Sequence, residues 1–207
     1  MNYFITGIGT DVGKTIASAI LVEALKADYW KPIQAGDLEY SDTHKTRALV
    51  SNKESCFFEE SYRLKHAMSP HAAAQKEGVN ISLDNFKVPQ TDKNLIIEGA
   101  GGLLVPLNKE HCVLDLIEQT QAKVILVSKH YLGSINHTLL SIESLKSRNI
   151  PIHGILFNGE ENTDTESIIL SMTGIPYLGR IVPLQEVNKS SVLQQANNLK
   201  KQWNEHI

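Results

Sequence analysis

The chain has 207 residues, of which 42% are hydrophobic and 21% are charged, and this composition is sufficient for a buried core. The net charge of −3 argues against a broad basic surface that binds nucleic acid, but it is compatible with a local basic pocket for phosphates. No signal peptide is apparent, no segment approaches the roughly 20 apolar residues that span a bilayer, and the two cysteines have no metal-type spacing. These features predict a cytoplasmic protein with free thiols and a single domain over residues 1–207.

Short apolar runs recur along the chain. Within them the apolar residues follow one another without alternation, which is typical of strands that helices cover on both faces. The predicted strands are residues 3–6, 95–99, 124–128, 154–158 and 177–181. Residues 30–34 are a weaker candidate, because Pro32 lacks the N–H that a central strand donates.

Between these runs, apolar residues recur three or four positions apart, as on one face of a helix. The predicted helices are residues 14–26, 112–119, 134–147 and 189–203. Residues 51–93 are the least patterned part, and we expect an irregular insertion with short helices there. The alternation of strands and helices predicts an α/β fold, with a mostly parallel sheet and helices on both faces.

The stretch TGIGTDVGKT, residues 6–15, lies between the first predicted strand and the first predicted helix. It departs from the usual phosphate-binding pattern G-x-x-x-x-G-K-[ST], because Ile8 stands where that pattern has glycine. A tight strand-to-helix turn is the alternative, but it leaves the Gly-Lys-Thr at the helix start unexplained. Unpaired N–H groups at a helix N-terminus bind anions, and Lys14 would reach the terminal phosphates of a nucleotide. The hydroxyl of Thr15 would bind Mg²⁺.

Two further motifs place charged residues near the ends of predicted strands. Glu98 in IIEGAGG lies at the rim where α/β proteins bind ligands, and it could hold Mg²⁺. Lys31 in WKPIQAG could stabilise phosphoryl charge as it develops. The alternatives are a solvent-facing glutamate and a surface lysine beside a turn. Asp42 could cap a helix or face Mg²⁺, and on sequence alone the capping role is favoured.

Four motifs occur in one order along the chain, namely GTDVGKT, WKPIQAG followed by Asp42, SPHAAA and EGAGG. GSINH, LFNG and YLGRI, at residues 133–137, 156–159 and 177–181, continue the pattern. Together these motifs resemble the dethiobiotin synthetase family, the ATP-dependent carboxylases of biotin synthesis, over essentially the whole chain. The resemblance implies a P-loop NTPase-like α/β domain that acts as a homodimer. It also implies ATP and Mg²⁺ at the site and no nucleic-acid or membrane partner.

The family converts 7,8-diaminononanoate, CO₂ and ATP into dethiobiotin, ADP and phosphate. One amine captures CO₂ as a carbamate, ATP phosphorylates the carbamate to a mixed anhydride, and the other amine closes the cyclic urea. Because carbamate, phosphoryl group and ADP are all anionic, Lys14, Lys31 and Mg²⁺ are expected to stabilise charge as it moves. The catalytic residues that the resemblance implies are Lys31, Lys14 and Thr10.

The resemblance also implies three sets of binding residues. The Mg²⁺ ligands are Thr15, Asp42 and Glu98. The nucleotide contacts are Asp11, Val12, Gly13, Lys14, Thr15, Ile16, Asp42, Glu98, Gly99, Ala100, Gly101, Asn158, Gly159, Val182, Pro183 and Leu184, with Asn158 reading adenine. The substrate contacts are Thr10, Lys31 and Ala35, joined by Ser134, Ile135 and Asn136, which receive the carboxylate tail at the other subunit's site.

Two positions depart from the family pattern. Ala35 stands where a Ser or Thr commonly hydrogen-bonds the substrate. One hydrogen bond contributes about 1 kcal/mol net, so we expect weaker rather than abolished binding, with a water or Gln34 as a replacement donor. Gly159 stands where Asp often follows the adenine-reading asparagine, and this leaves the base preference open.

Three other protein classes share the nucleotide-binding pattern. ParA- or MinD-like ATPase switches carry an additional lysine early in the P-loop, where this chain has Gly9. Cobyrinate-type amide synthases normally add a glutaminase domain, for which 207 residues leave no room. A generic small-molecule kinase is the remaining broad alternative.

Overall fold

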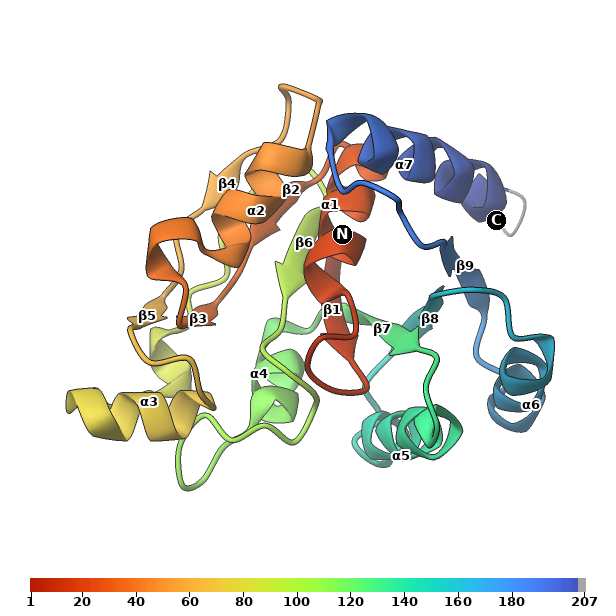
Figure 1. Cartoon of the computed structure of the whole chain (residues 1–207). Helices are drawn as coiled ribbons and strands as arrows, with labels where there is room; N and C mark the ends of the chain where they lie inside the picture. The colour runs from red at the N-terminus through yellow and green to blue at the C-terminus, as the bar shows by residue number, and fades with distance from the viewer. Residues whose placement is uncertain (205–207) are drawn as a thin grey trace.

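The computed structural model describes residues 1–204 and contains a seven-stranded sheet (Figure 1). All neighbouring strands in it run parallel. In spatial order the strands are β4 (Phe57–Phe58), β2 (Asp28–Trp30), β6 (Leu95–Glu98), β1 (Asn2–Gly7), β7 (Lys123–Lys129), β8 (Ile152–Asn158) and β9 (Tyr177–Ile181). The five strands predicted at residues 3–6, 95–99, 124–128, 154–158 and 177–181 are therefore confirmed.

The weaker candidate at 30–34 is wrong as a single strand. The chain leaves the main sheet after Trp30, passes through Lys31 and Pro32, and re-enters extended structure as β3 (Ile33–Ala35). β3 pairs with β5 (Tyr62–Leu64) in a separate two-stranded sheet. Proline has no N–H to donate to a neighbouring strand, and this explains why the extended segment is interrupted at Pro32.

Four helices confirm the predicted ones to within one residue at either end. They are α1 (Lys14–Leu25), α4 (Val113–Thr120), α5 (Ser134–Ser147) and α7 (Lys189–Asn204). The helix α2 (Asp42–Leu49) matches the helix start considered at Asp42, whereas α6 (Thr163–Thr173) was not predicted. The expected insertion holds α3 (Pro70–Glu77) and a short 3₁₀ turn, but it also contributes the strands β4 and β5.

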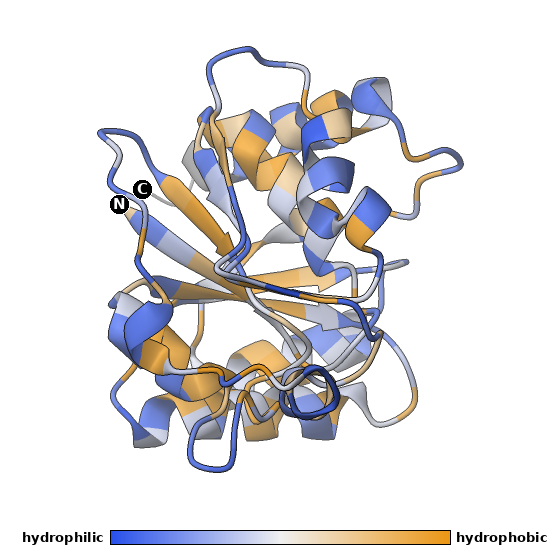
Figure 2. Ribbon diagram, turned by 90° about the vertical axis from the view of Figure 1, so that its left-hand side faces the viewer, coloured by the Kyte–Doolittle hydropathy of each residue, from blue (hydrophilic) through white to orange (hydrophobic). Residues whose placement is uncertain are grey.

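Helices cover both faces of the sheet (Figure 1). Side chains alternate across β1: Tyr3 and Ile5 pack into the apolar cluster formed with α1 and α7, and Phe4 packs into the cluster formed with α4. Figure 2 shows the hydrophobic strands between two layers of helices. Each fully buried apolar side chain of this kind contributes about 1.5–3 kcal/mol to folding. This core fixes the carboxyl ends of β2, β6 and β1 side by side.

Two further expectations concern the membrane and the cysteines. Within residues 1–204, every helix is too short or too polar to cross a bilayer. Cys56 and Cys112 are free thiols, as predicted.

Candidate active site

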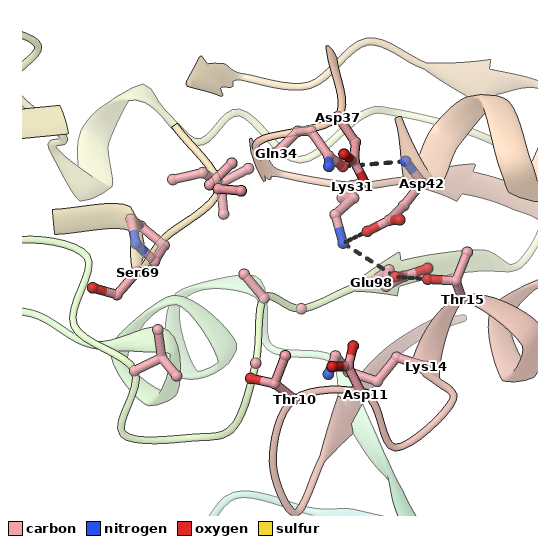
Figure 3. A pocket seen from close by; sticks show the side chains of 18 of the residues that line it. Thr10, Asp11, Lys14, Thr15, Lys31, Gln34, Asp37, Asp42, Ser69 and Glu98 are labelled. Carbon is pink, nitrogen blue, oxygen red and sulfur yellow. Dashed lines mark hydrogen bonds and ion pairs between the residues drawn. The ribbon is translucent and has the colours of Figure 1, made fainter. Parts of the chain in front are cut away.

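A cavity of about 690 Å³ opens at the carboxyl ends of the three neighbouring strands β2, β6 and β1 (Figure 3). The loop after β1 and the start of α1 form one wall. Lys31 enters from the chain that follows β2, and Glu98 is the last residue of β6. Because parallel strands all end at the same edge of a sheet, segments that are far apart in sequence converge here.

The loop between β1 and α1 is held in a tight conformation. Gly13 precedes α1 with φ +94°, a left-handed conformation that glycine adopts without steric cost. A Cβ at this position would lie 2.3 Å from Nδ2 of Asn158, so the position also has no space for a side chain. Lys14 folds back over the loop and donates from Nζ to the Gly9 carbonyl at 2.9 Å. The unpaired N–H groups at the start of α1 therefore line the cavity beside a cation.

Glu98 is fully buried and accepts hydrogen bonds on both carboxylate oxygens. Its Oε1 accepts from the Thr15 hydroxyl at 2.8 Å and from Lys31 Nζ at 3.1 Å. Its Oε2 accepts from the Tyr29 hydroxyl at 2.9 Å. A buried carboxylate is costly unless it is paired and hydrogen-bonded, and these three donors meet that requirement.

Lys31 joins two carboxylates. Its Nζ lies 2.8 Å from Asp42 Oδ2 in addition to its contact with Glu98 (Figure 3). Burial alone lowers the pKa of the Lys31 ammonium, but the two carboxylates outweigh burial and raise the pKa above its ordinary value. Burial raises the pKa of Asp42, whereas Lys31 and then Lys45 lower it, with a net decrease. Lys31 is therefore a fixed positive charge and Asp42 a fixed negative one at neutral pH.

Lys14 has a different electrostatic environment. Burial lowers the pKa of its ammonium to about 8, a decrease that the charge of Lys31 reinforces and that of Glu98 opposes. An anion placed between Lys14 and Lys31 would relieve the repulsion of these two cations. The cavity is thus suited to bind phosphate groups.

The donor set also fits Mg²⁺. The hydroxyl of Thr15 and the carboxylates of Asp42 and Glu98 are oxygen donors, which Mg²⁺ prefers. Lys31 contacts both carboxylates and Thr15 contacts one of them, so all three groups face a common region. Within the described part of the chain no cluster of three or more His, Cys, Asp or Glu side chains could hold a metal alone. Mg²⁺ commonly completes such a partial set with phosphate oxygens and water.

Comparison with known proteins identifies the family. A family model described as an AAA domain matches residues 1–191. The ATP-dependent dethiobiotin synthetase BioD of Christiangramia forsetii is 56% identical over 200 residues, which cover 97% of this chain and 96% of that protein. The enzyme of the same name from Cytophaga hutchinsonii is 53% identical over 205 residues, 99% of each chain.

The chain belongs to the dethiobiotin synthetase family. The sequence-based assignment is therefore confirmed.

Solved structures confirm the P-loop NTPase-like α/β fold class. A ParA family ATPase from Chlorobium tepidum has a TM-score of 0.60 at 14% identity, over 100% of this chain and 99% of that one. MinD complexed with Mg-ADP from Pyrococcus horikoshii has a TM-score of 0.57 at 14% identity, over 100% and 96% of the two chains. At this level of identity the likeness shows the fold alone.

The cavity brings together most of the residues expected at a dethiobiotin synthetase site. Those that line it are Thr10, Asp11, Gly13, Lys14, Thr15, Ile16, Lys31, Ala35, Asp42, Glu98, Gly99, Ala100 and Gly101. Val12 is buried beside the cavity, and its carbonyl accepts a hydrogen bond from Asn158 Nδ2 at 2.8 Å. Asn158 and Gly159, at the end of β8, thus lie on the far side of the phosphate-binding loop.

Two predicted segments lie outside the cavity. Ser134, Ile135 and Asn136 begin α5, with Ser134 buried and Asn136 exposed. Val182 and Pro183 are exposed and Leu184 is half-buried after β9. The roles assigned to these residues remain predictions.

The capping role favoured for Asp42 is wrong. Ser41 is the N-cap of α2, and Ser41 and His44 form the capping box, which makes Asp42 the first helical residue. Its side chain is therefore free to point into the cavity toward Lys31. The predicted orientation toward the Mg²⁺ site remains compatible with this geometry.

One charged residue of the cavity, Lys45, was not predicted, whereas Gln34 was considered only as a replacement donor. Lys45 lies 3.3 Å from both Asp37 and Asp42, and its position three residues after Asp42 on a helix was the available signal. Gln34 is committed to the backbone, since its Oε1 accepts from the Asp42 N–H at 3.2 Å and its Nε2 donates to the Gly36 carbonyl at 2.9 Å. One of the two Nε2 hydrogens of Gln34 is thus used on the backbone, and the other is left for the replacement role considered at the Ala35 position.

Proposed function

We propose that this chain forms dethiobiotin from 7,8-diaminononanoate, CO₂ and ATP, as a cyclo-ligase of biotin biosynthesis. The relatives carry the name ATP-dependent dethiobiotin synthetase. The single observation that carries the proposal is the Lys31 ammonium, which touches Asp42 and Glu98 in the same cavity as the phosphate-binding loop. A carboxylation that consumes ATP needs these charges at one point.

The proposed chemistry begins when one substrate amine adds to CO₂ and loses a proton, giving a carbamate. A carbamate oxygen then attacks the γ-phosphorus of ATP, forming a mixed anhydride and releasing ADP. The second amine attacks the anhydride carbon and loses a proton, so that phosphate leaves and the cyclic urea closes. Lys31 is placed to hold the carbamate and Lys14 to hold the phosphates, because preorganised cations stabilise charge as it develops. Mg²⁺, when bound by Thr15, Asp42 and Glu98, would neutralise phosphate charge.

Substrate binding is proposed to involve residues from two subunits. Thr10, Lys31 and Ala35 line the cavity and would face the diamine and its carbamate. Ser134, Ile135 and Asn136 would receive the substrate's carboxylate at a partner's site, as implied by the family resemblance. The Ser134 N–H already donates to the Tyr131 carbonyl at 2.9 Å, so an anion at the start of α5 would be held by the N–H groups of Ile135 and Asn136. The homodimer is proposed from the family resemblance, and in it the exposed Leu132 beside this helix start would be covered by the partner.

Adenine is proposed to bind between Asn158 and residues 182–184. The side-chain amide of Asn158 is tied to the phosphate-binding loop through its Nδ2, and its Oδ1 could accept from an adenine amino group. Because Gly159 has no side chain, base selectivity would depend on Asn158 and on the backbone. A cytoplasmic location and a single domain over residues 1–207 complete the proposal.

Phosphate release tests the proposed function. Diaminononanoate and bicarbonate added together should stimulate phosphate release from Mg·ATP, and neither should do so alone. Failure of the pair, together with activity on another acceptor, would contradict the proposal. A hydrolysis rate that is independent of any small acceptor would instead favour the ATPase-switch alternative.

A further inference from the structure

Tyr29 forms a hydrogen bond with Glu98, and the proposed chemistry gives Tyr29 no role of its own. Its hydroxyl donates to Glu98 Oε2 at 2.9 Å. Both residues have no measurable solvent exposure. The other oxygen of the same carboxylate, Oε1, faces the cavity through its contacts with Thr15 and Lys31. One oxygen of the Glu98 carboxylate thus bonds a buried tyrosine, and the other faces the cavity.

The sheet explains this arrangement. β2 runs beside β6, with Tyr29 paired to Ile96. Side chains two positions apart on a strand share a face, so Ile96 and Glu98 share one face of β6, and Tyr29 packs on that face in the same apolar cluster as Ile96. The carboxylate of Glu98 therefore meets Tyr29 from the adjacent strand, and it meets Lys31 from the chain that follows the end of that strand. The helix α1 supplies Thr15 from above that face.

Tyr29 is itself held rigidly. Its ring lies in the apolar cluster formed with α1, and its centroid is 5.8 Å from that of Phe57 on β4. A phenylalanine would satisfy this packing without adding a polar atom. The terminal torsion of a glutamate is soft, so a directional donor on a fixed ring restricts the carboxylate to one plane. The hydroxyl thus constrains the group that faces the cavity.

We propose that Tyr29 is a positioning residue, which orients Glu98 so that Oε1 faces the metal–nucleotide complex. This inference rests on the proposed role of Glu98 as a Mg²⁺ ligand. Hydrogen-bond partners of metal ligands typically affect metal affinity by about 10–100-fold. Tyr29 does not contact substrate in this arrangement, and it acts through Glu98.

The test is the metal affinity of Tyr29→Phe. Mn²⁺ binding to the protein saturated with ADP, followed by electron paramagnetic resonance, should weaken about 10–100-fold. ADP affinity measured with EDTA should change little, because the metal is then absent in both proteins. Unchanged Mn²⁺ affinity in a folded Tyr29→Phe variant would overturn the proposal.

Tyr62→Phe is the matched control, because its hydroxyl accepts from the Ser82 N–H and from Asn85 Nδ2, both at 2.9 Å, outside the cavity. This variant should retain Mn²⁺ affinity even if its thermal midpoint falls. A double-mutant cycle with Glu98→Gln separates positioning from general destabilisation. If Tyr29 acts through Glu98, Tyr29→Phe should have little further effect on Mn²⁺ affinity in the Glu98→Gln protein. Fully additive losses would contradict the proposal.

If Tyr29→Phe does not fold, a second experiment can use a protein in which the Tyr29 hydroxyl is retained. Site-specific 3-fluorotyrosine at position 29 gives a single ¹⁹F resonance. That resonance should shift when Mg²⁺ is added to the ADP complex, and an unmoved resonance under saturating Mg²⁺ would contradict the proposal. None of these experiments uses diaminononanoate, so their failure is distinguishable from failure of the proposed carboxylation.

Discussion

The Lys31 ammonium lies 3.1 Å from Glu98 Oε1, and this contact joins the chain that follows β2 to the last residue of the neighbouring strand β6. Only 4% of Lys31 and 0% of Glu98 is exposed, so solvent screens the pair little. Because screening is weak, the charge of the Lys31 ammonium acts strongly on an anion bound in the cavity that Lys31 lines. We expect Lys31 to act on charge that appears during the reaction, and Lys14 to act on the nucleotide.

Lys31→Gln should therefore lower turnover while ATP binding remains largely intact. Loss of one preorganised group that stabilises transition-state charge typically costs about 10²–10³ in kcat. Steady-state kinetics and equilibrium binding of ATP measure the two effects. Lys26→Gln, on the exposed end of α1, is the control and should behave as wild type. Lost ATP binding combined with normal turnover at saturation would contradict this role.

The shared-site proposal can be tested by mixing two inactive variants. Lys31→Gln removes the cation of a subunit's own cavity, and Asn136→Asp places a negative charge in the loop proposed to bind the substrate's carboxylate at the partner's cavity, which should repel it. Random reassociation gives half mixed dimers, each with one intact site, so about a quarter of wild-type activity should return. No recovery in dimers shown to exchange subunits would count against the shared site, as would a fully active monomer.

Glu166 should be essential for stability. It is held by the two terminal guanidinium nitrogens of Arg180 and by His130 Nε2, the last at 2.7 Å, so it links α6 to β9 and to the residue after β7. Glu166→Gln would leave the half-buried Arg180 with only the exposed Glu161, at 4.0 Å, as a charge partner. We expect a loss of about 3 kcal/mol, at the lower end of the range for breaking a buried pair. Urea unfolding measures the loss. Glu54→Gln breaks the exposed pair with Lys26 and should leave the midpoint almost unchanged.

The pH dependence of stability should include a contribution from Asp115. Burial raises the pKa of this carboxyl, but the Cys112 N–H and the Arg148 guanidinium outweigh burial and hold the pKa at about 2, against 3.8 when unperturbed. The resulting stabilisation of roughly 2 kcal/mol is present above pH 4 and is lost as pH falls toward 2. The unfolding penalty of Asp115→Asn should therefore be full at pH 7 and roughly half near pH 3. A penalty independent of pH would contradict this assignment, and the exposed Glu143→Gln variant serves as control.

The local sequence was sufficient to predict those site residues whose position depends on a single strand end or a single turn. Lys14 and Thr15 follow a strand and a glycine-rich loop, and Glu98 ends an apolar run, so each could be located before any contact was known. The spatial order of strands has no such local signal. Nothing near Tyr29 indicates that β2 lies beside β6, and its bond to Glu98 spans 69 positions.

The errors have equally local causes. Asp42 resembles a capping residue by type, but Ser41 immediately before it takes that position. The predicted strand at 30–34 divides at Pro32, and this division carries Lys31 out of the sheet and into the cavity. The features that made these two predictions fail are therefore the ones that place Lys31 and Asp42 at the site.

The most direct test of the central claim follows labelled carbon. With ¹⁴C-bicarbonate, diaminononanoate and Mg·ATP, the protein should form acid-stable labelled dethiobiotin, with one ADP released for each labelled molecule. The same reaction with Lys31→Gln should be strongly reduced. ADP release at the wild-type rate with no label in an acid-stable product would contradict the account.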